Sequence, residues 1–375
     1  MQQITYRIRV SRILFTLIFM FALSISLGIL TAQEPEFDES KIWDFKETGS
    51  DASLRGLCVV NENIVWASGS GGTVLKTDDA GENWQTVSPE GCSEHDFRDI
   101  HAFDSNNAVI INAGQPAVFY RTSDGGKSWT KVFEHDNEAA FFDAVAVFKS
   151  EYMIAMSDPI DGRVLLVESS DAGRTWNELT KERCPKSLPG EAGFAASGSN
   201  MIIDPEKGTI YLALGSAEEG TEHEFSRILI SADQAQTWKP IRCPINRNPS
   251  RGIFGLTCLP SDRLIAVGGD YLKPEQRNGT AAIVTLADDQ TEIDSPENGL
   301  SGFRSAVAFS YTPEETPFIV AVGPNGCDFA VEDEAVNWKR FSSEGFHAIR
   351  SFGSRTFWAS GANGRIAKLL IDQVE

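Results

Sequence analysis

The chain has 375 residues with 33 basic and 53 acidic side chains, which gives a formal net charge of −20. Nucleic acids and anionic membrane surfaces are therefore excluded as general partners, because both require a basic face. Apolar residues make up 41% of the sequence and 32 residues are glycine. This composition supports a large folded core with many turns.

The N-terminus has the pattern of a secretory signal. Three arginines precede an apolar run over residues 13–30, which ends near Ala32. This order is typical of a signal peptide cleaved after Ala32. The run is also long enough for an uncleaved anchor, which would be the chain's one route to a membrane. We expect export to the periplasm or the cell exterior, with residues 1–32 as signal, 33–41 as linker and 42–375 as a single domain.

An eight-residue phrase of the form Ser/Thr-x-Asp-x-Gly-x-Thr-Trp recurs along the rest of the chain. An Asp in a tight turn accepts hydrogen bonds from nearby backbone amides, and the Gly supplies a positive φ. Such a turn is part of a scaffold and carries no chemistry by itself. The phrase occupies residues 77–84, 122–129, 169–176 and 231–238, with a decayed copy at 331–338.

The phrase returns at intervals of roughly 50 residues, which is the length of one β-propeller blade. The longest gap leaves room for a unit without the phrase, predicted over residues 253–293. The last unit lacks an outer strand, which residues 42–45 can supply, so that the ring has no open edge. We predict an all-β, seven-bladed β-propeller closed by this N-terminal strand. Its inner strands are expected to begin at Leu54, Phe97, Phe142, Phe194, Ile253, Phe303 and Phe346.

Inner strands line the channel of a propeller, so one repeat position on them defines a candidate site. That position holds several basic side chains, and guanidiniums from neighbouring blades are suited to a carboxylate or another anion. The alternative is that the arginines pair with neighbouring carboxylates such as Asp99 or Asp143 and brace the channel. The repeat position holds Arg55, Arg98, Asp143, Ala195, Phe254, Arg304 and His347. The predicted ligand-binding residues are Arg55, Arg98, Arg304 and His347, with Asp270 from a loop.

The degenerate phrases, together with glycine-rich stretches at 69–73, 321–326 and 361–366, resemble the photosystem II stability/assembly factor family of Asp-box (BNR-repeat) propellers. The resemblance implies a non-enzymatic protein that holds partner polypeptides, with arginines on one face. Arg55, Arg98 and Arg304 would take that role here. The expected partner is a protein segment or a small anionic ligand, with no cofactor.

The same phrases and arginines also resemble sialidases, which implies a different function. A sialidase-like glycoside hydrolase requires an arginine triad, an acid/base carboxylate, and a Tyr activated by a Glu. Asp143 or Asp158 would be the acid/base, and Tyr271 with Glu191 the nucleophile pair. The sequence departs from the sialidase pattern because the usual phrases around the arginines are missing.

No metal site is predicted. The acidic loop at residues 218–224 has no defined ligand spacing, so a solvated insertion is the favoured interpretation. The six cysteines contain no CxxC pair, and we expect mostly free thiols with one disulfide at most.

Overall fold

Strands dominate the computed structural model, which describes residues 39–149, 151–216, 225–287, 290–296, 299–311, 315–331, 336–354 and 356–371. The described strands belong to one compact unit, Phe37–Glu375. The predicted signal segment, the acidic loop at 218–224 and the Asp of the decayed phrase lie outside the described residues. Within the described ranges, no helix has the length and apolar character needed to cross a bilayer.

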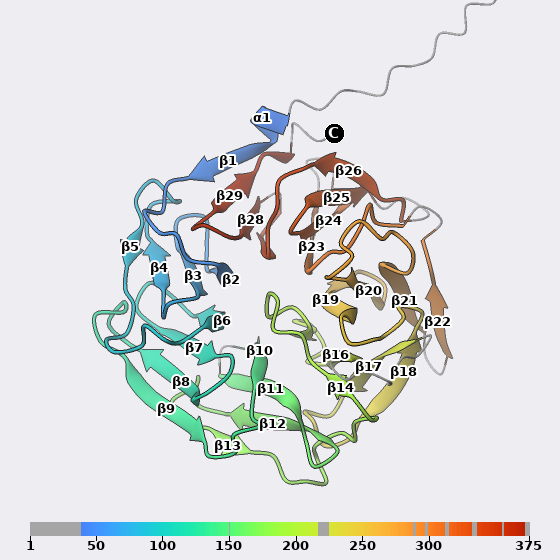
Figure 1. Cartoon of the computed structure of the whole chain (residues 1–375), viewed down its shortest axis with the longest axis horizontal. Helices are drawn as coiled ribbons and strands as arrows, with labels where there is room; N and C mark the ends of the chain where they lie inside the picture. The colour runs from blue at the N-terminus through green and yellow to red at the C-terminus, as the bar shows by residue number, and fades with distance from the viewer. Residues whose placement is uncertain are drawn as a thin grey trace, which may run out of the picture. The chain divides into compact units, whose positions relative to one another are not determined.

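Each of the first three repeats forms a four-stranded antiparallel sheet (Figure 1). The first sheet contains β2 (Leu54–Val59), β3 (Val65–Gly69), β4 (Val74–Thr77) and β5 (Gln85–Thr86). The second contains β6 (Phe97–Ala102), β7 (Ala108–Asn112), β8 (Ala117–Thr122) and β9 (Thr130–His135). The third contains β10 (Phe142–Phe148), β11 (Tyr152–Ile160), β12 (Arg163–Ser169) and β13 (Asn177–Glu178).

The next two repeats share one nine-stranded sheet. Among the described residues, they are joined where β16 pairs with β19, at Gly215 and Gly252. The strands of the first are β14 (Glu191–Ala192), β15 (Met201–Ile203), β16 (Ile210–Ser216), β17 (Ser226–Ser231) and β18 (Lys239–Cys243). Those of the second are β19 (Arg251–Leu259), β20 (Arg263–Asp270), β21 (Ala281–Ala287) and β22 (Gln290–Asp294). The repeat predicted without a phrase is thus confirmed.

The ring closes with strands from both ends of the chain. After a sheet of β23 (Ala306–Tyr311), β24 (Pro317–Gly323), β25 (Gly326–Val331) and β26 (Lys339–Ser342) come β27 (Ala348–Phe352), β28 (Thr356–Ser360) and β29 (Ile366–Leu369). The short helix α1 (Glu39–Ile42) leads into β1 (Trp43–Lys46), which pairs with β29. The all-β propeller closed by an N-terminal strand is therefore confirmed (Figure 1).

The repeated phrase forms the same turn in all four described copies. In the second copy, the hydroxyl of Thr122 donates to Asp124 at 2.9 Å and accepts from the amide of Gly126 at 2.9 Å. The Asp124 carboxylate also accepts from the amide and the hydroxyl of Ser128. These hydrogen bonds hold the carboxylate in its charged form and lower the pKa of Asp124 to about 2. The turn has a structural role, as predicted.

Aromatic side chains pack between neighbouring sheets next to these turns. Trp84 meets Trp358 edge to face, with ring centroids 6.4 Å apart, and Trp129 meets Trp66 in the same way. A Cβ at Gly81 would lie 2.9 Å from the Trp358 ring, so the turn of the first sheet lies directly on the last one. The phrase therefore stabilises the contact between blades.

Four of the predicted inner-strand starts are wrong. The fifth strand begins at Arg251, two residues before Ile253. The sixth strand begins at Ala306 instead of Phe303, and the seventh at Ala348 instead of Phe346. The fourth begins at Met201, because Phe194 and the residues after it form a loop. Figure 1 shows this yellow-green segment, between β14 and β15, reaching into the middle of the ring.

Candidate functional site

The shared repeat position coincides with a β-bulge on four inner strands. The register shifts between Leu54 and Gly56 on β2, and the shift recurs at the equivalent place on β6, β10 and β19. A bulge leaves one residue out of the ladder and re-aims its side chain. The residues set apart in this way are Arg55, Arg98, Asp143 and Phe254.

The channel is closed by residues 193–200, which we call the plug loop. Arg55 donates to the carbonyl of Ala196 at 3.2 Å, and Arg98 donates to that of Ala195 at 3.5 Å. From the opposite end, Arg350 donates to the carbonyl of Ser197 at 2.6 Å. The loop thus divides the channel into two cavities, which we call the front cavity and the rear cavity.

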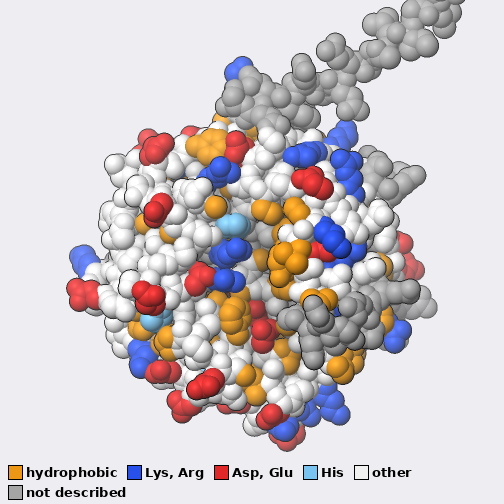
Figure 2. All heavy atoms as spheres, viewed as in Figure 1, with side chains coloured by type: hydrophobic (Ala, Val, Ile, Leu, Met, Phe, Trp, Pro, Cys, Tyr) orange, Lys and Arg blue, Asp and Glu red, His pale blue; other side chains and the backbone are white. Residues whose placement is uncertain are grey.

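The front cavity has a volume of about 530 Å³, within the range of ligand sites. Blue and pale-blue side chains gather at the middle of the face in Figure 2, beside a group of orange side chains. The wall is cationic on one side and aromatic on the other. The lining residues are Arg55, Arg98, Gly193, Phe194, Ala195, Ala196, Pro249, Phe254, Tyr271, Phe303, Ser305, Pro324 and His347.

The two guanidiniums at the front cavity keep donors available. Arg98 forms an ion pair with Asp96 at 2.7 Å, which orients its side chain. Within the described ranges, Arg55 has no carboxylate at ion-pair distance, and its one hydrogen bond goes to a carbonyl. Burial, and then the charge of Arg98, lower the pKa of Arg55, as expected when two like charges share a site.

His347 reaches the front cavity as a neutral imidazole. Burial, followed by the charges of Arg55, Arg98 and Arg365, lowers the pKa of His347 to about 3. Its Nε2 lies 3.1 Å from the hydroxyl of Ser53. The predicted convergence of Arg55, Arg98 and His347 is therefore observed, but the histidine adds a polar group instead of a charge.

The structure does not bring Arg304 and Asp270 to the front cavity. Arg304 is buried and forms an ion pair with Asp328 at 2.6 Å, while its other donors go to Ser301 and to the carbonyl of Phe303. Asp270 is also buried and accepts from the hydroxyl of Ser250 at 2.7 Å. The bracing alternative holds for Arg304, with Asp328 in place of the suggested carboxylates.

The residues of the hydrolase hypothesis do not assemble. Glu191 is buried and forms an ion pair with Arg227, with Arg247 at 3.7 Å. Tyr271 lies at the front cavity and contacts aromatic rings, and no described carboxylate accepts a hydrogen bond from its hydroxyl. A Tyr nucleophile needs an adjacent base. The geometry lacks both that base and the third arginine.

The buried Asp143 and the partly buried Asp158 form a carboxyl pair behind the plug loop. Burial, and then the charge of Asp158, raise the pKa of Asp143 well above its ordinary value. Burial raises the pKa of Asp158 to about 6, although the amide of Gly193 donates to it at 2.8 Å. A Cβ at Gly193 would lie 2.3 Å from Asp143. Asp158 therefore holds the base of the plug loop through this hydrogen bond, and Asp143 packs against it.

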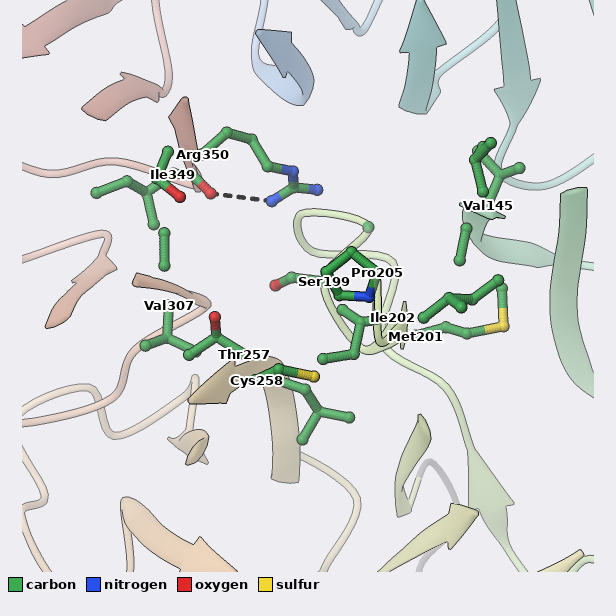
Figure 3. A pocket seen from close by; sticks show the side chains of 17 residues that line it. Val145, Ser199, Met201, Ile202, Pro205, Thr257, Cys258, Val307, Ile349 and Arg350 are labelled. Atoms are coloured by element: carbon green, nitrogen blue, oxygen red, sulfur yellow. Dashed lines mark hydrogen bonds between the residues drawn. The ribbon is translucent and has the colours of Figure 1, made fainter. Parts of the chain in front are cut away.

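The rear cavity has a volume of about 350 Å³, and most of the residues that line it are apolar. Figure 3 shows Arg350 extending toward the middle of this cavity, with Val145 on the far side. The guanidinium is held by the carbonyls of Ile349 and Ser197. Other wall residues include Ile203, Leu256, Cys258 and Val307.

Sequence reasoning missed the aromatic wall and Arg350. Phe254 occupies the same repeat position as Arg55, so a signal for it was present, but a Phe in a strand is more often a core residue. The pattern around Phe194 and Phe303 predicts the starts of strands, which conceals their place in the wall. Arg350 follows the predicted start of the last inner strand, and nothing in its local sequence distinguishes it.

The described residues contain no cluster of three metal-ligating side chains, and the six cysteines are free. Burial raises the pKa of Cys58 to about 11 and that of Cys243 to about 12. Thiols with such pKa values are weak nucleophiles at neutral pH. Neither cysteine carries chemistry in this environment.

Comparison with known proteins gives one consistent result. The photosystem II assembly lipoprotein Ycf48 of Synechococcus sp. (strain CC9902) is 27% identical over 119 residues, which are 31% of this chain and 35% of that protein. YCF48 from Cyanidioschyzon merolae superposes with a TM-score of 0.60 at 17% identity, over 88% of this chain and 99% of that one. The chain shares the β-propeller fold of this structure, and part of its sequence is similar to the assembly lipoprotein.

Two further structures define how far this likeness extends. YCF48 bound to D1 peptide matches with a TM-score of 0.58 at 17% identity, over 87% of this chain and 94% of that one. A streptogramin B lyase matches with the same TM-score at 12% identity, over 87% and 96%. At these identities the likeness shows a shared fold, and no model of a protein family matches the sequence. The chain spans about a third of the length of the curated relative.

Proposed function

We propose that this Ycf48-like propeller is a non-enzymatic binding protein that holds a segment of another polypeptide, or a small anionic ligand, at the front cavity. The observation that carries the proposal is the pair Arg55 and Arg98, whose guanidiniums face a cavity of about 530 Å³. Arginine offers several donors in a fixed fork and stays charged, which suits a carboxylate.

Two observations support a protein segment as the occupant. The front cavity is open beside an aromatic wall, as expected for a site that receives a side chain and its backbone. A propeller of the same fold has been solved with a peptide bound. The hydrolase alternative has no such support, since its catalytic residues are engaged elsewhere.

The test compares two variants of the full chain in capture of polypeptides from the exported fraction of the native host. Arg55→Ala/Arg98→Ala removes both guanidiniums of the front cavity. Arg174→Ala is the matched control, because Arg174 is exposed on the turn of the third sheet. We expect polypeptides bound by the wild type and by the control to be lost from the double variant, as identified by mass spectrometry.

Equal capture by all three proteins, or no capture by any, would contradict the proposal. Thermal unfolding of the double variant is measured alongside. A change of about 1 kcal/mol or less is expected, because both arginines bond to the plug loop through single, long contacts. A much larger loss would assign the two arginines to bracing of the channel.

Export is also part of the proposal. The apolar run at residues 13–30 and the small residue at Ala32 support cleavage after Ala32. An uncleaved run would instead tether the propeller to a membrane. N-terminal sequencing of the protein purified from its host distinguishes a start at Gln33 from an intact N-terminus.

A further inference from the structure

The aromatic wall of the front cavity is a separate small cluster. The rings of Phe194 and Phe254 stack with centroids 4.0 Å apart and an interplanar angle of 7°. Phe303 meets Phe254 edge to face at 4.7 Å. Tyr271 stands edge-on to both stacked rings, at 6.4 and 6.2 Å. These rings form a surface that extends across the cavity from the two guanidiniums.

The top of this wall is exposed to solvent. Tyr271 is 45% exposed, and the next residue, Leu272, is 70% exposed. Phe254 and Phe303 beneath them are almost fully buried. Large apolar side chains exposed beside a cavity are typical of a surface that a partner covers. A ring entering from solvent would meet Tyr271 first and then the partly exposed Phe194, which stacks on the buried Phe254.

The charges facing the front cavity set the charge of its occupant. The lining residues include two guanidiniums and no Asp or Glu. Asp96, just outside the lining, neutralises one of the guanidiniums through its pair with Arg98, and His347 is neutral because its pKa is about 3. One net positive charge remains. The rest of the molecule is strongly acidic, so a run of acidic side chains would be repelled outside this spot.

We infer that the front cavity selects a polypeptide segment that presents one aromatic side chain beside one carboxylate, and that it rejects polyacidic segments. The carboxylate lies between Arg55 and Arg98. The aromatic side chain packs against Tyr271 and the Phe194–Phe254 stack, where offset and edge-to-face ring contacts add to burial. The inference rests on the proposed function, because it specifies the chemistry of the segment held at that site.

The test uses four synthetic peptides and the full chain, with binding measured by isothermal titration calorimetry. The reference is Ac-Gly-Ser-Phe-Asp-Ser-Gly-NH2. In the second peptide Ala replaces Phe, in the third Asn replaces Asp, and the fourth carries four consecutive Asp residues between the glycines. The reference is expected to bind at least about tenfold more tightly than each of the others. The Ala peptide loses a buried ring, the Asn peptide loses a charge-assisted hydrogen bond, and the tetra-Asp peptide is repelled by the acidic surface.

The Tyr271→Ala variant then tests whether the aromatic wall provides the higher affinity for the Phe peptide. It should weaken the reference peptide about three- to tenfold and change the Ala peptide by less than about twofold. Tyr311→Ala is the matched control, because Tyr311 is an exposed tyrosine on β23 that does not line the cavity. It should leave every affinity unchanged.

The outcomes separate the two proposals. Equal binding of the Phe and Ala peptides, both lost in Arg55→Ala/Arg98→Ala, would leave the proposed function standing and overturn this inference. Tightest binding of the tetra-Asp peptide would overturn it as well. Binding of no peptide, together with capture of host polypeptides that does not depend on the arginines, would overturn both.

Discussion

The front and rear cavities lie on opposite sides of the same plug loop, and each contains arginine side chains that bond to that loop. At the front, Arg55 and Arg98 reach loop carbonyls at 3.2 and 3.5 Å. At the rear, Arg350 reaches the carbonyl of Ser197 at 2.6 Å and is held by a second carbonyl. The rear guanidinium therefore holds the loop through a short contact, whereas the front guanidiniums reach the loop only through longer ones.

The carboxyl groups that contact the plug loop also lie in two places, one behind the front cavity and one toward the rear cavity. Behind the front cavity, Asp143 and Asp158 lie beneath Gly193 of the plug loop. Toward the rear, Asp99 accepts the amides of Ile100 and Val145, and its carboxylate lies against Gly198. The loop is thus held from the rear by Arg350 and packs there against Asp99, while its other side faces the front cavity.

The largest expected effect comes from a substitution at Gly198 that displaces the plug loop. Gly198 has a φ of +70°, and a Cβ there would lie 2.2 Å from the Asp99 carboxyl. Gly198→Ala should lower the free energy of unfolding by ~2–5 kcal/mol through strain and crowding combined, and should abolish capture of polypeptides. Gly162→Ala is the control, since its φ is +76° but nothing lies near its Cβ. Equal losses of unfolding free energy in both variants, measured by denaturant titration, would show that the contact between Gly198 and Asp99 has no special role.

The plug loop is also where prediction from the sequence failed. The turns of the repeated phrase could be predicted because each is closed by hydrogen bonds within four residues, as between Asp124 and Ser128. The segment at Phe194 has the same pattern as the starts of other inner strands, at Phe97 for example. Its position in the channel depends on Arg55, Arg98 and Arg350, which are distant in sequence.

Of the candidate site, sequence periodicity could locate Arg55, Arg98 and His347 but not the direction of Arg304. All of these residues follow an apolar residue near an inner strand. At Arg55 and Arg98 a β-bulge aims the side chain into the channel. Arg304 precedes its strand and turns to Asp328 on β25. A partner on another strand of the same sheet leaves no trace in a repeat alignment.

The next effect in size distinguishes rear from front arginines. Arg350→Ala should lower the free energy of unfolding by ~1–3 kcal/mol, because the buried carbonyl of Ser197 loses its donor. Arg55→Ala should lower it by less than about 1 kcal/mol while weakening polypeptide capture. Denaturant unfolding and capture assays on both variants check this. A larger stability loss in Arg55→Ala than in Arg350→Ala would reverse the assignment of roles.

The carboxyl pair predicts a dependence of stability on pH. Folded-state pKa values are raised at Asp143 and Asp158, and at Asp99 to about 6. The folded chain then binds more protons than the unfolded chain between the ordinary Asp pKa and these values. This extra proton binding stabilises the folded state. The contribution is fully present below the ordinary Asp pKa of about 4 and is lost as the pH rises through about 6.

Asp143→Asn tests this assignment by removing one charge of the pair. It should raise the free energy of unfolding by ~1–3 kcal/mol at pH 7.5, where a buried charge is costly, and have little effect at pH 4.5. Asp136→Asn is the control, because Asp136 is exposed. Urea unfolding at both pH values checks the sign, and destabilisation of Asp143→Asn at pH 7.5 would show that the ionised pair supports the loop.

The smallest effect is expected at His347. It tests whether the positive charge at the front cavity comes from arginine alone. Since burial and then nearby Arg55 lower the pKa of His347 to about 3, the imidazole stays neutral at pH 5.5 and at pH 8. In the Asp143→Asn background, binding of the reference peptide should change by less than about twofold across this range, and His347→Gln should preserve it. Calorimetry at both pH values checks this, and a rise in affinity toward pH 5.5 that disappears in His347→Gln would make the histidine a third cation of the site.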